Sequence, residues 1–263
     1  MVKGANIPFL ILYPVLTICL MANFKGNASW TFGKKSGALQ EAADTSQLPQ
    51  KTNHVPKVRI TAPVKGGRYA VNSMIHYTIV VSDAEDGDSR YNEILPKEIF
   101  LRVQYFKDTS RIPAHFNPSA AKQQGISAME ASNCFNCHNM KSSLIGPSFE
   151  QINHKYPHTD SSIQLLTARV LNGSKGIWGS AVMPTHKELT VATARQMIQW
   201  IMDHGADAGL NYYTGNSGMI RLQPTNQSSQ GLYVLTASYT DHGLKNIAGK
   251  RLTGIDNLII RLK

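Results

Sequence analysis

Cysteine is scarce in this sequence, which holds three cysteines in 263 residues, at positions 19, 134 and 137. A protein of this size that depended on disulfides would need more of them. No second cysteine pair is present to complete a zinc site around Cys134 and Cys137. The βαβ pattern that surrounds a thioredoxin-like redox pair is missing as well. Disulfide, zinc and redox-thiol chemistry therefore explain this pair poorly.

The apolar run nearest the N-terminus, residues 7–21, is short. At about 15 residues it falls below the roughly 20 of a membrane-spanning helix. A lysine precedes it and small residues follow it, which predicts a signal peptide at 1–28 and a periplasmic or secreted protein. An uncleaved membrane anchor remains an alternative. Lipidation of Cys19 is another, although the bulky Ile18 is unusual in a lipoprotein signal.

Charged residues make up only 17% of the chain and aromatic residues 8%. The formal net charge is +10, but residues 116–207 carry seven Lys/Arg against six Asp/Glu, so the excess lies in the flanks. A nucleic-acid-binding protein would show a dense basic stripe with aromatic platforms, and the sequence has neither. We therefore predict no nucleic-acid partner.

Two parts of the chain carry strand signals. Residues 29–53 are polar with weak turn and periodicity signals, which indicates a linker. Residues 54–115 then contain β-branched, partly alternating runs separated by turn clusters, and similar runs return in residues 216–263. The predicted strand runs are 58–60, 75–81 and 99–105 in the first part and 219–222, 231–239 and 257–262 in the second.

Residues 116–208, between these parts, show helical periodicity. One predicted helix has a possible N-cap at Asp160 and is closed by Gly173. A second begins after Thr190 and ends at Gly205. The predicted buried faces are Ile163, Leu166 and Val170 in the first helix, and Ala194, Met197, Ile198 and Ile201 in the second.

Neither strand-rich part buries enough apolar surface to fold alone. Together they supply about seven strands, the number of an immunoglobulin-like sandwich. We therefore predict a multi-domain chain in which an all-α domain is inserted in, or flanked by, an all-β sandwich. Such insertion is tolerated because the termini of a small domain often lie close together. Two separate β modules, or a partly ordered tail, are the alternatives.

The run Cys134-Phe135-Asn136-Cys137-His138 is the attachment motif of c-type haem. Two thiols three positions apart lie on one helical face, where they form thioethers with the two vinyl groups of a porphyrin. The adjacent His138 then reaches the iron from one side. The motif predicts one covalent haem c.

Met183 is the predicted sixth ligand of the iron. It lies in a loop between Gly179 and Pro184, a setting that suits a ligand better than a helix-packing residue. A thioether is a soft ligand that favours ferrous iron, so His/Met coordination raises the reduction potential. His186 is the chief alternative and His154 a remoter one, whereas Met140 lies too near His138 to reach the opposite side of the ring.

Residues 119–205 resemble the small bacterial class I monohaem cytochromes c in the order and spacing of several motifs. The matching runs are Cys-x-x-Cys-His, Ile145-Gly146-Pro147-Ser148-Phe149, Arg169-Val170-Leu171-Asn172-Gly173, Gly176-Ile177-Trp178-Gly179, Met183-Pro184 and the helix that ends near Trp200-Ile201. The resemblance implies that the Pro147 carbonyl accepts a hydrogen bond from His138. It also implies that Arg169 and Trp178 hold the haem propionates. A solvated helix face for Arg169 and ordinary packing for Trp178 are the alternatives.

The flanks are similar to the PKD-like β domains that occur beside cytochrome domains in secreted bacterial sugar-dehydrogenase-type proteins. The similarity rests on residues 58–105, with their turn Ser82-Asp83-Ala84-Glu85-Asp86-Gly87, and on residues 233–241. It implies an immunoglobulin/PKD-like sandwich and a dehydrogenase as electron donor, with a cytochrome or oxidase as acceptor. Asp83, Asp86 and Asp88 offer carboxylates for Ca²⁺, although a plain turn explains them as well.

Electron transfer is the predicted function, because two strong axial ligands leave the iron no open position for catalysis. The chain is then not an enzyme, although it is a possible accessory subunit of a dehydrogenase. One alternative is a haem enzyme or gas sensor in which the bond to Met183 is weak or absent. Another is a haem-containing adaptor whose β domain binds carbohydrate or protein partners.

Overall fold

The computed structural model describes residues 52–107, 124–225, 230–245 and 250–263. The predicted signal peptide, Cys19 and nearly all of the predicted linker lie outside these residues. The described residues lie within one compact unit. In the described ranges, no helix combines the length and the apolar character needed to cross a membrane.

The first sheet has β3 (Met74–Asp83) at its centre. On one side it pairs with β1 (Lys57–Ala62), and it also pairs with the short β4 (Gly87–Asp88) and with β9 (Ser217–Arg221), all antiparallel. Burial along β3 alternates, because successive side chains of a strand point to opposite faces. β9 follows the helices in the chain, so this sheet joins strands from both sides of the helical region.

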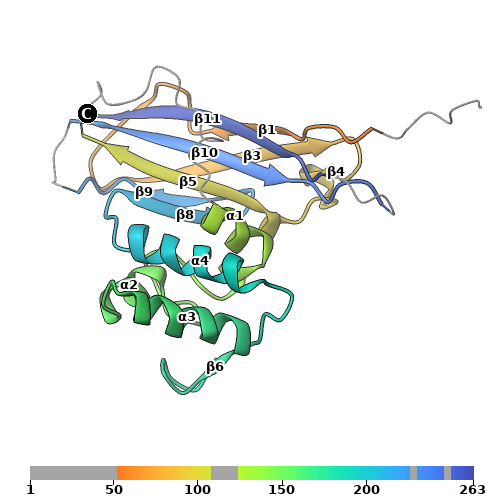
Figure 1. The fold of residues 1–263 in the computed structure, drawn as a ribbon. Helices are drawn as coiled ribbons and strands as arrows, with labels where there is room; N and C mark the ends of the chain where they lie inside the picture. The colour runs from red at the N-terminus through yellow and green to blue at the C-terminus, as the bar shows by residue number, and fades with distance from the viewer. Residues whose placement is uncertain (1–51, 108–123, 226–229, 246–249) are drawn as a thin grey trace, which may run out of the picture. The chain divides into compact units, whose positions relative to one another are not determined.

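The second sheet runs in the order β2 (Arg68–Tyr69), β11 (Thr253–Leu262), β10 (Leu232–Thr240), β5 (Ile99–Phe106) and β8 (Leu210–Thr214). Only β2 pairs with its neighbour in parallel. β5 precedes the helices, yet both strands that flank it, β10 and β8, follow them. Figure 1 shows β10, β11 and β5 layered over β1 and β3. The inward side chains of both sheets form one apolar core, which includes Tyr77, Ile79, Leu101, Val103, Leu235 and Ile260.

Between β5 and β8 the described residues form four α-helices: α1 (Gln124–Ala131), α2 (Phe149–Lys155), α3 (Asp160–Asn172) and α4 (Val191–His204). The predicted caps of α4 are confirmed: the Thr190 hydroxyl accepts a hydrogen bond from the Thr193 N–H at 3.1 Å, and Gly205 follows the last turn. Gly173 closes α3 with a φ of 78°, but its N-cap is Thr159, because that hydroxyl accepts from the Ser162 N–H. Asp160 is the first helical residue instead.

The predicted fold class, an all-α cytochrome c domain inserted in or flanked by an all-β immunoglobulin/PKD-like sandwich, is wrong. The helical region is not all-α, because α3 and α4 are separated by a small hairpin of β6 (Ser174–Lys175) and β7 (Val182–Met183). Its core is not purely helical either, since Phe100 of β5 and Leu210 of β8 are buried in it beside the residues of the helices. The described chain is a mixed structure of four α-helices and several sheets, in which helices and strands share a core.

Candidate cofactor site

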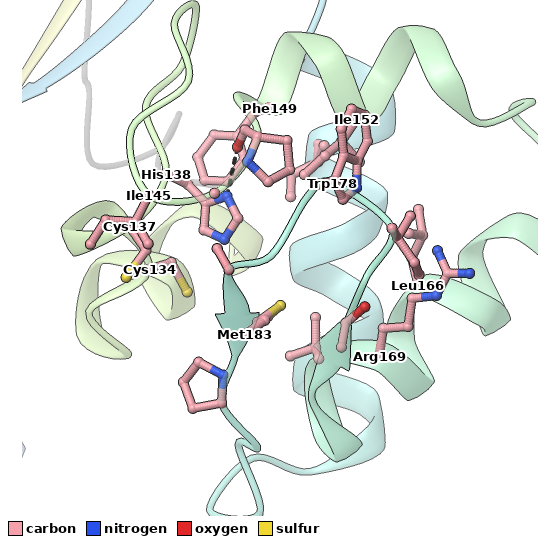
Figure 2. A pocket seen from close by; sticks show the side chains of 18 of the residues that line it. Cys134, Cys137, His138, Ile145, Phe149, Ile152, Leu166, Arg169, Trp178 and Met183 are labelled. Carbon is pink, nitrogen blue, oxygen red and sulfur yellow. Dashed lines mark hydrogen bonds between the residues drawn. The ribbon is translucent and has the colours of Figure 1, made fainter.

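A cavity opens in the helical region beside the β6–β7 hairpin (Figure 2). Its empty volume is about 1050 Å³, which includes the part open to solvent. Apolar side chains from all four of these helices form most of its wall, among them Met129, Phe149, Leu166 and Ile201. The seven residues singled out in the sequence all line this cavity: Cys134, Cys137, His138, Pro147, Arg169, Trp178 and Met183.

The two cysteines and the histidine lie on one tight turn. A short 3₁₀-helix spans Cys134–Asn136 and follows Asn133, whose φ of 59° is left-handed. The N–H groups of Cys137 and His138 both donate to the Cys134 carbonyl, at 3.2 and 3.0 Å. The turn therefore gathers all three functional side chains at one end of the cavity, as Figure 2 shows. Desolvation raises the pKa of Cys134 to about 12, so this thiol lacks the thiolate character of a redox-active cysteine.

The His138 imidazole is held in one tautomer. Its Nδ1 atom lies 2.7 Å from the carbonyl oxygen of Pro147, and a carbonyl only accepts, so Nδ1 carries the proton. Nε2 then keeps its lone pair, which is the form in which histidine binds a metal. Desolvation lowers the pKa of His138 and favours the neutral ring, although the bond to Pro147 acts in the opposite direction.

Two neighbours fix the position of this ring. Phe149 stacks on it, with ring centroids 5.7 Å apart and an angle of 15° between the planes. Gly146 passes so close that an added Cβ would lie 2.6 Å from the His138 Cε1 atom. Only glycine leaves room for the imidazole at that point. Neither contact was predicted, since no sequence spacing indicates which glycine touches a ring.

Met183 reaches the cavity from the hairpin. It lies in β7 and pairs with Ser174 in β6, and Figure 2 shows its side chain directed into the cavity. The backbone is close-packed here as well, because a Cβ on Gly173 would lie 2.8 Å from the Met183 carbonyl oxygen. The loop expected around Met183 is thus a short hairpin whose strands are two residues each.

The alternative ligands have other surroundings. The Nδ1 atom of His186 lies 2.8 Å from a carboxylate oxygen of Glu188. His154 is exposed on α2, and Met140 is completely buried. The structure describes all three residues, and none of them lines the cavity.

Arg169 and Trp178 lie at the cavity with basic and aromatic partners. The Arg169 guanidinium donates to the Tyr156 hydroxyl at 2.5 Å and lies over the same ring, 5.4 Å from its centroid. The Lys155 ammonium lies 4.3 Å from the centroid of the Trp178 ring. Tyr156 and Lys155 were missed in the sequence, because they are far along the chain from the residues they contact.

The acidic turn at Asp83, Asp86 and Asp88 is occupied by hydrogen bonds. Asp83 accepts from two backbone N–H groups of the turn, Asp86 from Tyr239 and His242, and Asp88 pairs with Arg90. In the described part of the chain, no group of three His, Cys, Asp or Glu side chains is arranged to hold a metal. A plain turn accounts for these residues.

In a comparison with known proteins, part of this chain is similar to several bacterial cytochromes c. No family model matches the chain. Cytochrome c-552 of Hydrogenobacter thermophilus is 33% identical over 86 residues, which are 33% of this chain and 79% of the relative. Cytochrome c-552 of Nitrosomonas europaea is 31% identical over 27% of this chain and 68% of its own length. The chain belongs to the cytochrome c-551/c-552 family.

One more relative and one solved structure are similar to part of this chain. Cytochrome c-551 of Azotobacter vinelandii is 29% identical over 82 residues, 31% of this chain and 99% of the relative. The crystal structure of wild-type Nitrosomonas europaea cytochrome c552 matches 30% of this chain and 96% of that protein, with 28% identity and a TM-score of 0.29. Cytochromes c carry covalently bound haem c and transfer electrons rather than catalyse reactions. This cytochrome is accordingly an electron-transfer protein and not an enzyme.

The cavity of this cytochrome suits haem c. It offers two free thiols on one turn, a neutral imidazole whose Nε2 is available to a metal, and a thioether within the same lining. The remaining wall is mainly apolar, as a porphyrin face requires. Thiols, an imidazole and a thioether are groups that c-type cytochromes use to hold haem.

Proposed function

We propose that the protein carries single electrons through one haem c, joined by thioethers to Cys134 and Cys137, with His138 and Met183 as axial ligands. The contact between His138 Nδ1 and the Pro147 carbonyl supports this proposal most directly. It holds the imidazole in the tautomer that binds iron, on a turn that also presents both thiols to the cavity.

Haem c supplies a one-electron ferric/ferrous couple when it is bound. The chain's own groups then set the conditions of transfer. His138 is steadied by Pro147 and Phe149, and Met183 is held on its hairpin. Together they would hold the iron and leave it no position open to a substrate. The apolar wall excludes water and raises the free energy of the more highly charged ferric state, which raises the reduction potential.

Arg169 and Trp178 are proposed to bind the haem propionates. A guanidinium is a charge-assisted donor to carboxylates, and an indole N–H is a neutral one. Tyr156 holds the Arg169 guanidinium at the cavity, and Lys155 lies over the Trp178 ring. These partners restrict both donors to the neighbourhood of the cavity before any carboxylate binds.

A periplasmic or secreted location is proposed from the N-terminal signal pattern, with a membrane tether as the alternative fate of that segment. The similarity of the flanks to PKD-like domains beside cytochromes supports a sugar or alcohol dehydrogenase as donor. A second cytochrome or an oxidase is the proposed acceptor. These partners rest on analogy with the family.

Mass spectrometry of protein matured in a host with haem-ligation machinery tests the attachment. We expect the intact mass to include one haem, and the haem-bearing peptide to contain residues 134–138. The double variant Cys134→Ala/Cys137→Ala should lose that mass, whereas Cys19→Ala should retain it. Wild-type protein that matures without added mass would overturn the proposal.

A further inference from the structure

The haem-attachment turn is packed against the second sheet by an aromatic cluster. Phe135, between the two cysteines, is only 5% exposed. Its ring centroid lies 5.5 Å from that of Phe100 and 6.0 Å from that of Tyr212. Phe100 belongs to β5 and Tyr212 to β8, so both contacts come from strands rather than from the helices around the cavity.

Phe100 and Tyr212 lie on the same face of the sheet. Strand register pairs Tyr212 with Arg102, two positions from Phe100, and residues two apart on a strand share a face. The neighbour Leu101 points the other way, into the core between the sheets. One face of β5 thus packs into the core between the two sheets, and the other face supports the attachment turn.

The contact continues from Phe135 to the axial histidine. Phe149 meets Phe135 edge to face, with centroids 5.5 Å apart and planes at 86°. Phe149 in turn stacks on the His138 ring. An unbroken series of ring contacts therefore leads from the sheet to the side chain proposed to bind iron, and the same Phe135 is flanked by both proposed thioether positions.

This support is additional to what the relatives share. Their matches span at most 86 residues, and 82 residues account for 99% of the Azotobacter vinelandii protein. Phe100 and Tyr212 are 112 positions apart, so no such match contains both. The strand pair that covers Phe135 is therefore not a shared component of these small cytochromes.

We propose that Phe100 and Tyr212 are positioning residues for the haem, which hold Phe135 and thereby fix the attachment turn and the His138 ring. Phe100 and Phe135 are 7% and 5% exposed, so this ring cluster excludes water from the attachment turn itself, and low exposure to water beside a haem disfavours the ferric state. The sheet then raises the reduction potential of the cytochrome. This inference rests on the proposed function, because it requires haem on Cys134 and Cys137.

The test uses the full-length, haem-loaded protein with Phe100→Ala and Tyr212→Ala. We expect haem to remain attached, the reduction potential to fall, and the ferric low-spin spectrum to broaden as the His138 ring gains freedom. Tyr212→Phe keeps the ring and should restore the wild-type potential. If Phe100→Ala fails to fold, Phe100→Leu replaces it, with the same expected direction.

Leu101→Ala is the matched control, because it removes a buried side chain from the same strand on the opposite face. It should reduce thermal stability and leave the potential at the wild-type value. Folded Phe100 and Tyr212 variants with wild-type potential and spectra would overturn the inference. An equal shift in the reduction potential of Leu101→Ala would also overturn it, because the shift would then come from a general loss of packing. Wild-type protein without covalent haem would refute the proposed function itself, which separates the two failures.

Discussion

The Nδ1 atom of His138 and the carbonyl oxygen of Pro147 are 2.7 Å apart, the distance of a strong N–H···O hydrogen bond. Nine positions separate the two residues, and the Gly146 backbone between them lies against the imidazole ring. A hydrogen bond thus restrains one edge of the ring, and the Gly146 backbone restrains one face. Both restraints act on the same proposed ligand.

Gly146→Ala should displace the His138 ring. The new Cβ would lie 2.6 Å from Cε1, so the ring or the backbone must shift. Overpacking of this kind destabilises a protein by about 1–3 kcal/mol, and we also expect a lower reduction potential. Thermal unfolding and redox titration of the haem-loaded variant check both effects. Gly209→Ala is the control, because its added Cβ would lie 3.3 Å from the nearest atom. It should change the thermal stability and the reduction potential much less than Gly146→Ala does.

Met183→Ala should leave haem attached but open one axial position. Axial ligands tune haem potentials over about 0.8 V, and loss of a thioether removes the preference for ferrous iron, so the potential should fall by about 0.1 V or more. Spectroelectrochemistry measures the fall, and new binding of CO reports the open position. Met219→Ala alters an exposed methionine of β9 and should behave as wild type. An unchanged potential in Met183→Ala would assign the ligand role to another residue.

Asn153→Leu should destabilise the packing of α2 against α4. The buried Asn153 side chain donates to the carbonyl oxygens of Ile201 and Met202 at 2.9 and 2.7 Å. Leucine leaves buried acceptors without these donors, which lowers the free energy of unfolding by about 1–3 kcal/mol. Urea unfolding measures the loss. Gln199→Leu removes an exposed amide from α4 and should cost less than 0.5 kcal/mol or so.

The ionised Asp86 carboxylate should stabilise the folded protein, and this contribution should be lost in acid. Burial raises the pKa of this carboxyl, but hydrogen bonds from the His242 N–H and the Tyr239 hydroxyl outweigh it, so the pKa lies below the ordinary 3.8. A lowered pKa means that the contribution is complete above about pH 3.8 and disappears as the pH falls through the folded-state value. Asp86→Asn should therefore unfold at a lower temperature than wild type at pH 7.

The difference in unfolding temperature between Asp86→Asn and wild type should narrow as the pH falls below about 3.8 and through the lowered folded-state pKa of Asp86, below which both side chains are uncharged. Thermal unfolding across pH 2–7, roughly the range in which carboxyls titrate, measures it. Asp203→Asn changes an exposed carboxyl on α4 and serves as the control. A gap that stays constant with pH would show that the charge of Asp86 does not matter.

Local patterns in the sequence were sufficient for several elements. The β-branched run 75–81 lies within β3, and the run 99–105 lies within β5. The stripe Ala194, Met197, Ile198 and Ile201 is buried in α4 as its period indicates. These predictions succeeded because strand and helix periods are properties of short segments.

Contacts between distant segments could not be derived in the same way. In the sequence Phe100 looks like any other apolar strand residue. Nothing near it shows that its side chain packs against the helices rather than into the core between the two sheets. The fold class failed for that reason, since sharing of a core between strands and helices leaves no periodic signal. The β6–β7 hairpin was missed because strands of two residues are too short to show alternation.

The site was easier to predict than the fold. The thioether motif is contiguous, and the residues from Pro147 to Met183 follow in an order that resembles a known class, so all seven could be named before the cavity was seen. The roles of the seven remain predictions. Gly146, Phe149 and Tyr156 acquire meaning only through atoms brought close by folding, which explains their absence from that set.

β5 pairs with β8 and β10, and both of these strands come later in the chain. Synthesis from the N-terminus therefore completes β5 before either of its partners. A ribosome produces β5 and the thioether motif well before residues 232–240, which complete one side of that strand. The nascent chain therefore presents Cys134 and Cys137 while the edge of β5 is still unpaired. Covalent haem ligation acts on an accessible thiol pair, whereas the finished protein has the intervening Phe135 buried. The thioether motif is therefore complete before the last of the strands that surround β5 and bury Phe135 has been made.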